Sequence, residues 1–285
     1  YNYKDSLSTQ DATIFDKWIM YKLDNVVSDF KKYTMNYRFD LMANSIYEFV
    51  WNEYCDWYLE IAKNNVNETT KCFLIYSIIR IIKVCHPITP FITEEIWSEL
   101  YKKGFVDDES LIRSSFPSQI RISKEDDINS RVDLLKDIIR KIRKTRTELG
   151  IHPKEIIETM IYIKRNELNE DVLENIPLIN ALANINLSVI SDEQPSSRDF
   201  IDLIDDKYIL YLCLKDMIDI TSELLKIEKK ISQKKNILHK VNLKLNNKSF
   251  IERAPSEIIN QNIANKNKIE NDILSLENLR ITLSN

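Results

Sequence analysis

The sequence of 285 residues predicts a mainly α-helical protein in three parts: a helical bundle over residues 1–125, a small α/β domain over 131–217 and an antiparallel coiled-coil hairpin over 218–285. Three observations predict this fold class. Apolar residues recur at helical spacing through the first part, β-prone runs alternate with a helical run in the second, and heptads run through the third.

One long helix of the bundle, residues 47–63 (YEFVWNEYCDWYLEIAK), is rich in aromatic rings. At about 100° per residue, one face collects apolar side chains, and we expect that face to lie in the core. It holds Tyr47, Val50, Trp51, Tyr54, Cys55, Tyr58, Ile61 and Ala62. The opposite face holds Phe49, Asn52, Glu53, Asp56, Glu60 and Lys63, with Trp57 at its edge. A phenylalanine and three acids are an unusual mixture for a solvent face, so either a second helix or a ligand covers it.

The bundle continues through a buried helix and a proline-interrupted turn. Residues 73–85 are apolar nearly all round, which is typical of a buried helix. Pro87 and Pro90 in the stretch HPITPF then break the chain. We expect Thr93 to cap the next helix and Gly104 to end it.

The second part alternates helix and strand. A helix around residues 131–146 places basic residues opposite its apolar face, namely Arg140, Lys141, Arg143, Lys144 and Arg146. The runs ETMIYIKR, NLSVI and YILYLCL have the β-branched and aromatic composition of strands, and a helical run over 169–184 separates the first two. This alternation predicts a small α/β domain.

The third part carries two heptad seams. The first has spacings of 4 and 3 through Ile220, Leu224, Ile227, Ile231, Lys234, Leu238, Val241 and Leu245. The second runs through Ile259, Ile269, Ile273, Leu276 and Leu283, with Asn262, Lys266 and Arg280 at intervening positions. The two helices are expected to fold back on each other as an antiparallel hairpin, roughly 35 to 40 Å long at about 1.5 Å per residue.

Composition excludes several classes of protein. Two glycines are too few for a P-loop, a dinucleotide fingerprint or a nucleophile elbow, and three scattered histidines suggest no metal site or triad. The four cysteines form no C-x-x-C pair, so we expect free thiols. No apolar run approaches the roughly 20 residues of a membrane helix and no signal peptide is recognisable, which predicts a cytoplasmic protein.

Charge is divided unevenly along the chain. Residues 222–250 hold eight lysines against two glutamates, a net charge of +6, whereas the whole chain has a net charge of −4. An acidic body with a basic appendage suits a polyanionic partner that touches only part of the surface. Such contacts release counterions and make binding salt-dependent.

Rings beside polar groups in the bundle are suited to single-stranded RNA, whose bases stack on aromatic side chains. Arg38, within the run YRF, is the best candidate for a phosphate or base contact, although a salt bridge to a nearby acid would also account for it. The rings can equally be core residues, and the lysines can equally be the solvated exterior of a coiled coil.

Several stretches together resemble one family. YRFD (37–40), YEFVWNEYCDWYLE (47–60), HPITPFITEEIW (86–97), IRKIRKTRTELGIHP (139–153) and SFIERAPSEII (249–259) resemble the C-terminal half of bacterial-type valyl-tRNA synthetases. The first and third stretches are shared across the class I synthetases, whereas WNEYCDWYLE and the turn around SFIERAP are specific to the valyl branch. The resemblance covers residue 11 to the end.

The resemblance implies a helical anticodon-binding domain, a small junction domain and a coiled-coil arm that braces the corner of the tRNA. It implies that Arg38, Phe39, Asn52, Glu53 and Asp56 lie at or beside the anticodon surface. The basic helix and arm would contact the tRNA through Arg140, Arg143, Lys144, Lys229, Lys230, Lys234, Lys235, Lys240 and Lys244. The partner implied is valine tRNA, bound by a monomer, with neither DNA nor a membrane involved.

The two ATP-handling signatures of this class, His-x-Gly-His and Lys-Met-Ser-Lys-Ser, do not occur in the sequence. We therefore expect no cofactor in this chain, with ATP and Mg²⁺ belonging to the catalytic part of the full-length ligase, and no activity from this chain alone. The alternative is a stand-alone helical-bundle and coiled-coil module, derived from a synthetase, that binds a protein or an RNA.

Overall fold

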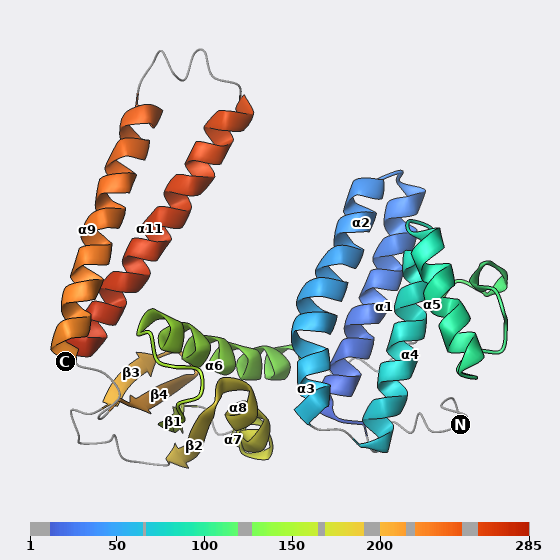
Figure 1. Cartoon of the computed structure of the whole chain (residues 1–285), viewed down its shortest axis with the longest axis horizontal. Helices are drawn as coiled ribbons and strands as arrows, with labels where there is room; N and C mark the ends of the chain where they lie inside the picture. Colours follow the sequence, from blue (N-terminus) through green and yellow to red (C-terminus); the bar gives the residue numbers. More distant parts are fainter. Residues whose placement is uncertain are drawn as a thin grey trace. The chain divides into compact units, whose positions relative to one another are not determined.

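The computed structural model describes residues 12–64, 67–118, 127–164, 169–190, 200–214, 220–246 and 256–284 (Figure 1). The chain divides into two compact units, residues 1–139 with 177–182, and residues 140–176 with 183–285. The division falls inside helix α6 (Ile128–Glu148), after the predicted boundary at 125–131. The mainly α-helical fold class is confirmed, whereas the assignment of separate roles to three parts stays a prediction.

The first unit is a helical bundle. Its elements are α1 (Ile14–Met35), α2 (Phe39–Glu48), the π-helix η1 (Phe49–Tyr58), α3 (Leu59–Asn64), α4 (Glu68–Cys85), α5 (Pro90–Lys102), the short 3-10 turn η2 (Leu111–Arg113) and the first part of α6, up to Ile139. In Figure 1, α2 to α3 form one continuous column beside α1, and α4 packs against both α1 and α5.

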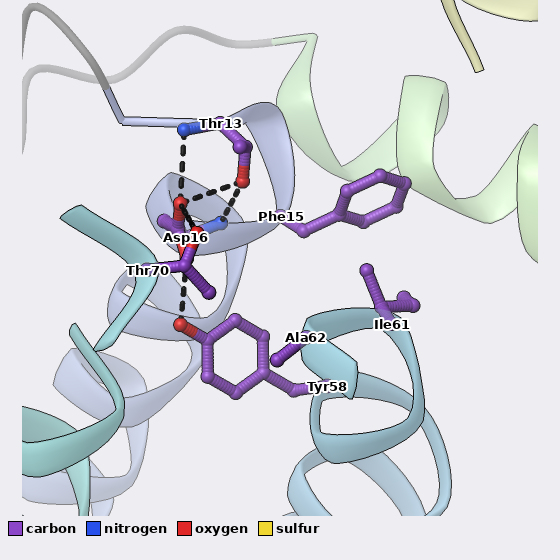
Figure 2. A pocket seen from close by; sticks show the side chains of 7 residues that line it. All are labelled: Thr13, Phe15, Asp16, Tyr58, Ile61, Ala62 and Thr70. Atoms are coloured by element: carbon purple, nitrogen blue, oxygen red, sulfur yellow. Dashed lines mark hydrogen bonds between the residues drawn. The ribbon is translucent and has the colours of Figure 1, made fainter. Parts of the chain in front are cut away.

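A buried carboxylate joins three elements of this bundle (Figure 2). Asp16 forms a capping box with Thr13 at the start of α1. Its carboxylate also accepts hydrogen bonds from the hydroxyls of Tyr58 (2.6 Å) and Thr70 (3.3 Å). Burial and the neighbouring Asp16 raise the pKa of Tyr58 above its ordinary value. The cavity beside this network measures about 10 Å³, which is far too small for an amino acid or a nucleotide, so the network supports the fold.

The π-helix changes which residues of the aromatic helix face the core. Phe49 and Trp57, expected on or near the outer face, are buried at 4% and 7% exposure, while Tyr47 and Trp51, expected in the core, are 60% and 56% exposed. The prediction was wrong for these four residues because it assumed α-helical turns. Hydrogen bonds from residue i to i+5 widen each turn, so the angular step per residue is smaller and the apolar face rotates.

Helix α5 begins earlier than the sequence predicts. Its N-cap is Thr89 and Pro90 occupies the first helical position, where the missing N–H costs nothing. Thr93 is instead buried in the first turn, and its hydroxyl lies 2.8 Å from Nδ1 of His86. Gly104 has a φ of +73° just beyond the helix, so the predicted end of α5 is confirmed.

The second unit contains a four-stranded sheet in the order β2-β1-β4-β3. The strands are β1 (Ile157–Ile163), β2 (Ile185–Ile190), β3 (Phe200–Ile204) and β4 (Tyr208–Cys213). Strands β1 and β2 are parallel, and the chain passes from one to the other through α7 (Asn169–Glu174) and α8 (Ile176–Ala183), as a parallel pair requires. The sequence predicted three of the strands; it missed β3, a short edge strand that pairs antiparallel with β4.

The C-terminal arm is an antiparallel pair of helices, α9 (Ile220–Leu245) and α11 (Ser256–Ser284), as Figure 1 shows. Both predicted seams meet between the helices. Their buried members are Ile227, Ile231, Val241, Ile269, Ile273 and Leu283. The SFIERAP stretch lies outside the described residues. Among the helices that the structure describes, none is both long and apolar enough to cross a bilayer.

Candidate nucleic-acid interface

An exposed row of rings and polar groups runs along α2 and η1. At its first end, Tyr37 is 81% exposed and has a φ of +56°, a left-handed conformation that is rare for a bulky residue. The ring of Phe39, 54% exposed, meets the Tyr37 ring edge to face, with the two centroids 6.4 Å apart. Backbone strain of this kind clusters at functional sites, so the α1–α2 turn is a credible contact surface.

The side chain of Arg38, the residue between Tyr37 and Phe39 in the sequence, is held by a carboxylate. Arg38 precedes α2, and its Nε and Nη2 donate to Oδ1 and Oδ2 of Asp40 at 2.9 and 2.7 Å. The hydrogen bond from Arg38 lowers the pKa of Asp40 to about 2. The pair is more than half exposed on both sides, so a phosphate can compete with Asp40 for the bidentate position.

At the other end of the row lie two rings that sequence reasoning placed in the core. Tyr47 and Trp51 lie parallel, with an interplanar angle of 4°. Asn52 and Asp56 are exposed beside them, as the sequence predicted, and the Asn52 amide donates to Glu48. The i→i+5 hydrogen bonding of η1 turns the Trp51 ring to the surface. No feature of the sequence predicted this π-helix.

Glu53, unlike the other residues predicted for this row, has its carboxylate paired with lysines of the bundle. Its carboxylate binds the ammonium of Lys136 and lies 3.7 Å from that of Lys22. The Lys136 side chain is only 3% exposed. The structure therefore gives Glu53 an internal ion pair on the side of η1 that faces α1 and α6.

The basic face of α6 is narrower than predicted. Arg140, Arg143 and Lys144 are exposed, and Lys144 lies 3.8 Å from Glu148 on the next turn. Arg146 instead points inward, where it donates to the carbonyl oxygens of residues 152, 155, 183 and 184. Its placement on the basic face was wrong, because four carbonyl acceptors, two of them 37 and 38 residues away in the sequence, replace water as its partners. Burial lowers the pKa of Arg146.

The predicted lysines of the arm fall into two groups. Lys229, Lys230, Lys240 and Lys244 are exposed and form no ion pair with any residue inside the described ranges. Lys234 and Lys235 pair across the two helices with Asp272 and with Glu277, the latter at 2.7 Å. The first group is therefore directly available to an anion.

No group of three or more His, Cys, Asp or Glu residues within the described part of the chain is placed to hold a metal ion. The chemistry open to these surfaces is ring stacking, hydrogen bonding to base edges and ion pairing with phosphates. All three belong to nucleic-acid recognition.

Comparisons with known proteins agree with this chemistry. Residues 16–161 match the model of the anticodon-binding domain of tRNA ligase, which covers more than half of the chain. The chain therefore belongs to the family of anticodon-binding domains of tRNA ligases. Residues 219–284 match the tRNA-binding arm of valyl-tRNA synthetase, so within that family the chain corresponds to the C-terminal part of a valine–tRNA ligase. The predicted resemblance is confirmed.

Individual proteins that are similar to this chain are valine–tRNA ligases. A valine–tRNA ligase of Legionella pneumophila (strain Lens) is 33% identical over 256 residues, which are 86% of this chain and 28% of the relative. That of Buchnera aphidicola subsp. Acyrthosiphon pisum (strain APS) is 28% identical over 279 residues, 95% of this chain and 28% of the relative. The chain thus spans little more than a quarter of the length of these relatives.

Proposed function

We propose that this chain is the tRNA-binding part of a valine–tRNA ligase and that its partner is valine tRNA. The observation that carries the proposal is the exposed row of rings and polar groups on α2 and η1, which lies within the segment matched by the anticodon-binding model. Folded proteins seldom leave several large rings open on one face without a partner. Unpaired bases of an anticodon loop offer the flat surfaces and polar edges that fit this row.

The charges of the two surfaces indicate which part of the tRNA each one contacts. Arg38, Phe39, Asn52 and Asp56 lie on the anticodon surface, and Glu53 supports that surface from inside through its bond to Lys136. The exposed arm lysines (Lys229, Lys230, Lys240 and Lys244), the paired Lys234 and Lys235, and the basic residues Arg140, Arg143 and Lys144 contact phosphates. The body can be acidic because phosphate contacts contribute affinity mainly through the arm. The three parts, 1–125, 131–217 and 218–285, are the anticodon-binding domain, the junction and the tRNA arm.

Catalysis lies elsewhere in the longer ligase. Valine selection and ATP-dependent activation belong to the remaining three quarters of such a protein, and this chain alone is an inactive, monomeric, cytoplasmic tRNA binder. Valine-dependent pyrophosphate exchange by the purified chain would contradict this.

The test is a binding titration of the chain against valine tRNA and against the same tRNA with its anticodon replaced, each at two salt concentrations. We expect the anticodon change to weaken binding at both concentrations and higher salt to weaken both tRNAs. Phe39→Ala should lose the anticodon preference. Phe91→Ala is the matched control, because this ring on α5 is 91% exposed outside the row. Equal affinity for the two tRNAs would overturn the assignment of the bundle.

A further inference from the structure

Tyr47 and Trp51 differ from the buried rings of the bundle. Trp18, Trp57 and Tyr58 are at most 7% exposed, whereas Tyr47 and Trp51 are more than half exposed. Their ring centroids are 6.4 Å apart although the rings are parallel, so each ring leaves much of its surface uncovered. The pair is a flat, apolar and open surface on a rigid helix.

The π-helix is what presents this surface. Trp51 lies in the first turn of η1, and Tyr47 lies just before it in α2. Continuous α-helical geometry would turn both rings toward the core side, as their spacing predicted. Insertions of π-helix are rare and are found frequently at functional sites. Here the insertion exposes two rings while it buries Phe49 and Trp57 in their place.

The charges around the pair select the kind of ligand. Glu48 and Asp56 are exposed on either side of Trp51, and both repel a phosphate. Asn52 follows Trp51 directly; its amide nitrogen donates to Glu48, and its Oδ1 accepts no hydrogen bond from a described residue. The surroundings therefore favour a neutral planar group that has a hydrogen-bond donor on its edge.

We propose that Tyr47 and Trp51 form a stacking platform for one unpaired base of the bound RNA, with the Asn52 amide beside the edge of that base. This deepens the proposed function and rests on it. Tyr47, the nearer ring of the platform, lies eight residues beyond Phe39, about 12 Å along the helix axis at roughly 1.5 Å per residue, so the platform is a second contact separate from the Arg38–Phe39 end. A protein partner fits less well, because the polar and acidic groups around the rings interrupt any continuous apolar patch.

The chain offers a direct spectroscopic test. It contains four tryptophans, and Trp51 alone among them is exposed; Trp18, Trp57 and Trp97 are 0%, 7% and 2% exposed. Titration with the anticodon stem-loop of valine tRNA should quench the acrylamide-accessible emission, and Trp51→Phe should abolish that quenching while it keeps most of the affinity. Trp51→Ala should weaken binding about 5- to 150-fold, the range that stacking of one base supplies.

Salt dependence distinguishes the platform from a phosphate contact. With whole valine tRNA as the ligand, the loss caused by Trp51→Ala should be the same factor at low and high salt, whereas Lys229→Gln in the arm should reduce the salt dependence of binding. Phe91→Ala is again the control for loss of an exposed ring. If wild type binds the stem-loop but Trp51→Ala binds equally well, or if Trp51 emission is unchanged at saturation, the platform is overturned and the proposed function survives. If wild type binds no RNA, both fail together.

Discussion

The bundle and the arm each contain a lysine on an apolar helix face, and the two are accommodated differently. In the bundle, the Lys136 side chain is 3% exposed, binds Glu53 and lies 4.7 and 5.2 Å from the ring centroids of Trp18 and Trp57. In the arm, the Lys234 side chain is 36% exposed and binds Asp272, which is 39% exposed. Both pairs join separate helices, but only the ammonium of Lys136 is almost completely removed from water, while the Glu53 side chain is 25% exposed.

The same kind of ion pair contributes differently to stability when it is buried and when it is exposed. A buried ammonium loses its hydration and depends on its carboxylate and on the ring faces, so removal of the carboxylate is costly. An ammonium at the edge of a two-helix seam keeps much of its water, and its ion pair contributes roughly 0–1 kcal/mol. The bundle pair therefore fixes how helices pack, whereas the arm pair interrupts an apolar seam at small cost.

The strongest test of this comparison is Glu53→Ala. We expect it to lower the free energy of unfolding of the bundle by about 3–5 kcal/mol, because it removes the carboxylate from a buried ammonium. Urea unfolding followed by tryptophan fluorescence measures this, since all four tryptophans lie at or before residue 97 and thus in the bundle.

Lys136→Met is the matched control for Glu53→Ala. It removes the buried charge, keeps the volume of the side chain and leaves Glu53 beside Lys22, so its effect should be small. Equal losses from the two variants would mean that packing, and not charge, explains the Lys136 contact.

The next largest effect is expected in the seam of the arm. Ile273→Ala should destabilise the arm by about 2 kcal/mol, the low end for such truncations, because its buried cluster with Val241 and Ile269 is small. Faster amide hydrogen exchange in α9 and α11, with no change in the fluorescence-detected unfolding of the bundle, is the expected signature. Ile281→Ala is the control on the same helix, since that side chain is 54% exposed and its truncation should change neither.

Apolar periodicity was enough to predict the bundle and both heptad seams, and β-prone composition was enough to predict three of the four strands, because each depends on local sequence. These local patterns failed where the partner of a side chain lies far away in the sequence. The partner of Glu53 is 83 residues away in α6, and the acceptors for the Arg146 side chain come partly from residues 183 and 184. Strand β3 was missed because a five-residue edge strand with an acid in it carries little apolar pattern.

The candidate site shows the same limit. Arg38, Phe39, Asn52 and Asp56 were predicted from sequence stretches that resemble a family, and the structure exposes all four. Tyr47 and Trp51 were assigned to the core because a step of about 100° per residue is right for an α-helix and wrong for a π-helix. No local pattern in the sequence indicated the ten-residue π-helix Phe49–Tyr58.

A smaller effect is expected when Lys234 of the arm is replaced. Lys234→Leu should stabilise the arm by up to about 1 kcal/mol, because it completes the apolar seam and leaves Asp272 partly hydrated. The same variant should lower the slope of log affinity against log salt for tRNA by about 1 if Lys234 also contacts phosphate. Lys229→Gln, at an exposed lysine, should lower that slope without changing the hydrogen exchange of the arm. A destabilised Lys234→Leu arm would show that the pair with Asp272 holds the helices together.

The smallest effect concerns the exposed pair Arg38–Asp40, which lies at the opposite extreme from Lys136–Glu53. The pKa of Asp40 is lowered to about 2, so the pair stabilises the fold above the ordinary carboxyl range and loses that contribution as pH falls through about 2. Exposure keeps this contribution too small to detect in unfolding experiments. An NMR titration of the Asp40 carboxyl should show a midpoint near pH 2 that Arg38→Ala raises toward the ordinary value, while Lys102→Ala, which removes the partner of Glu99, leaves it unchanged. RNA that takes the guanidinium away from Asp40 should raise the midpoint as Arg38→Ala does, whereas an unchanged midpoint in the complex would mean that Arg38 stays with Asp40 and contacts no phosphate.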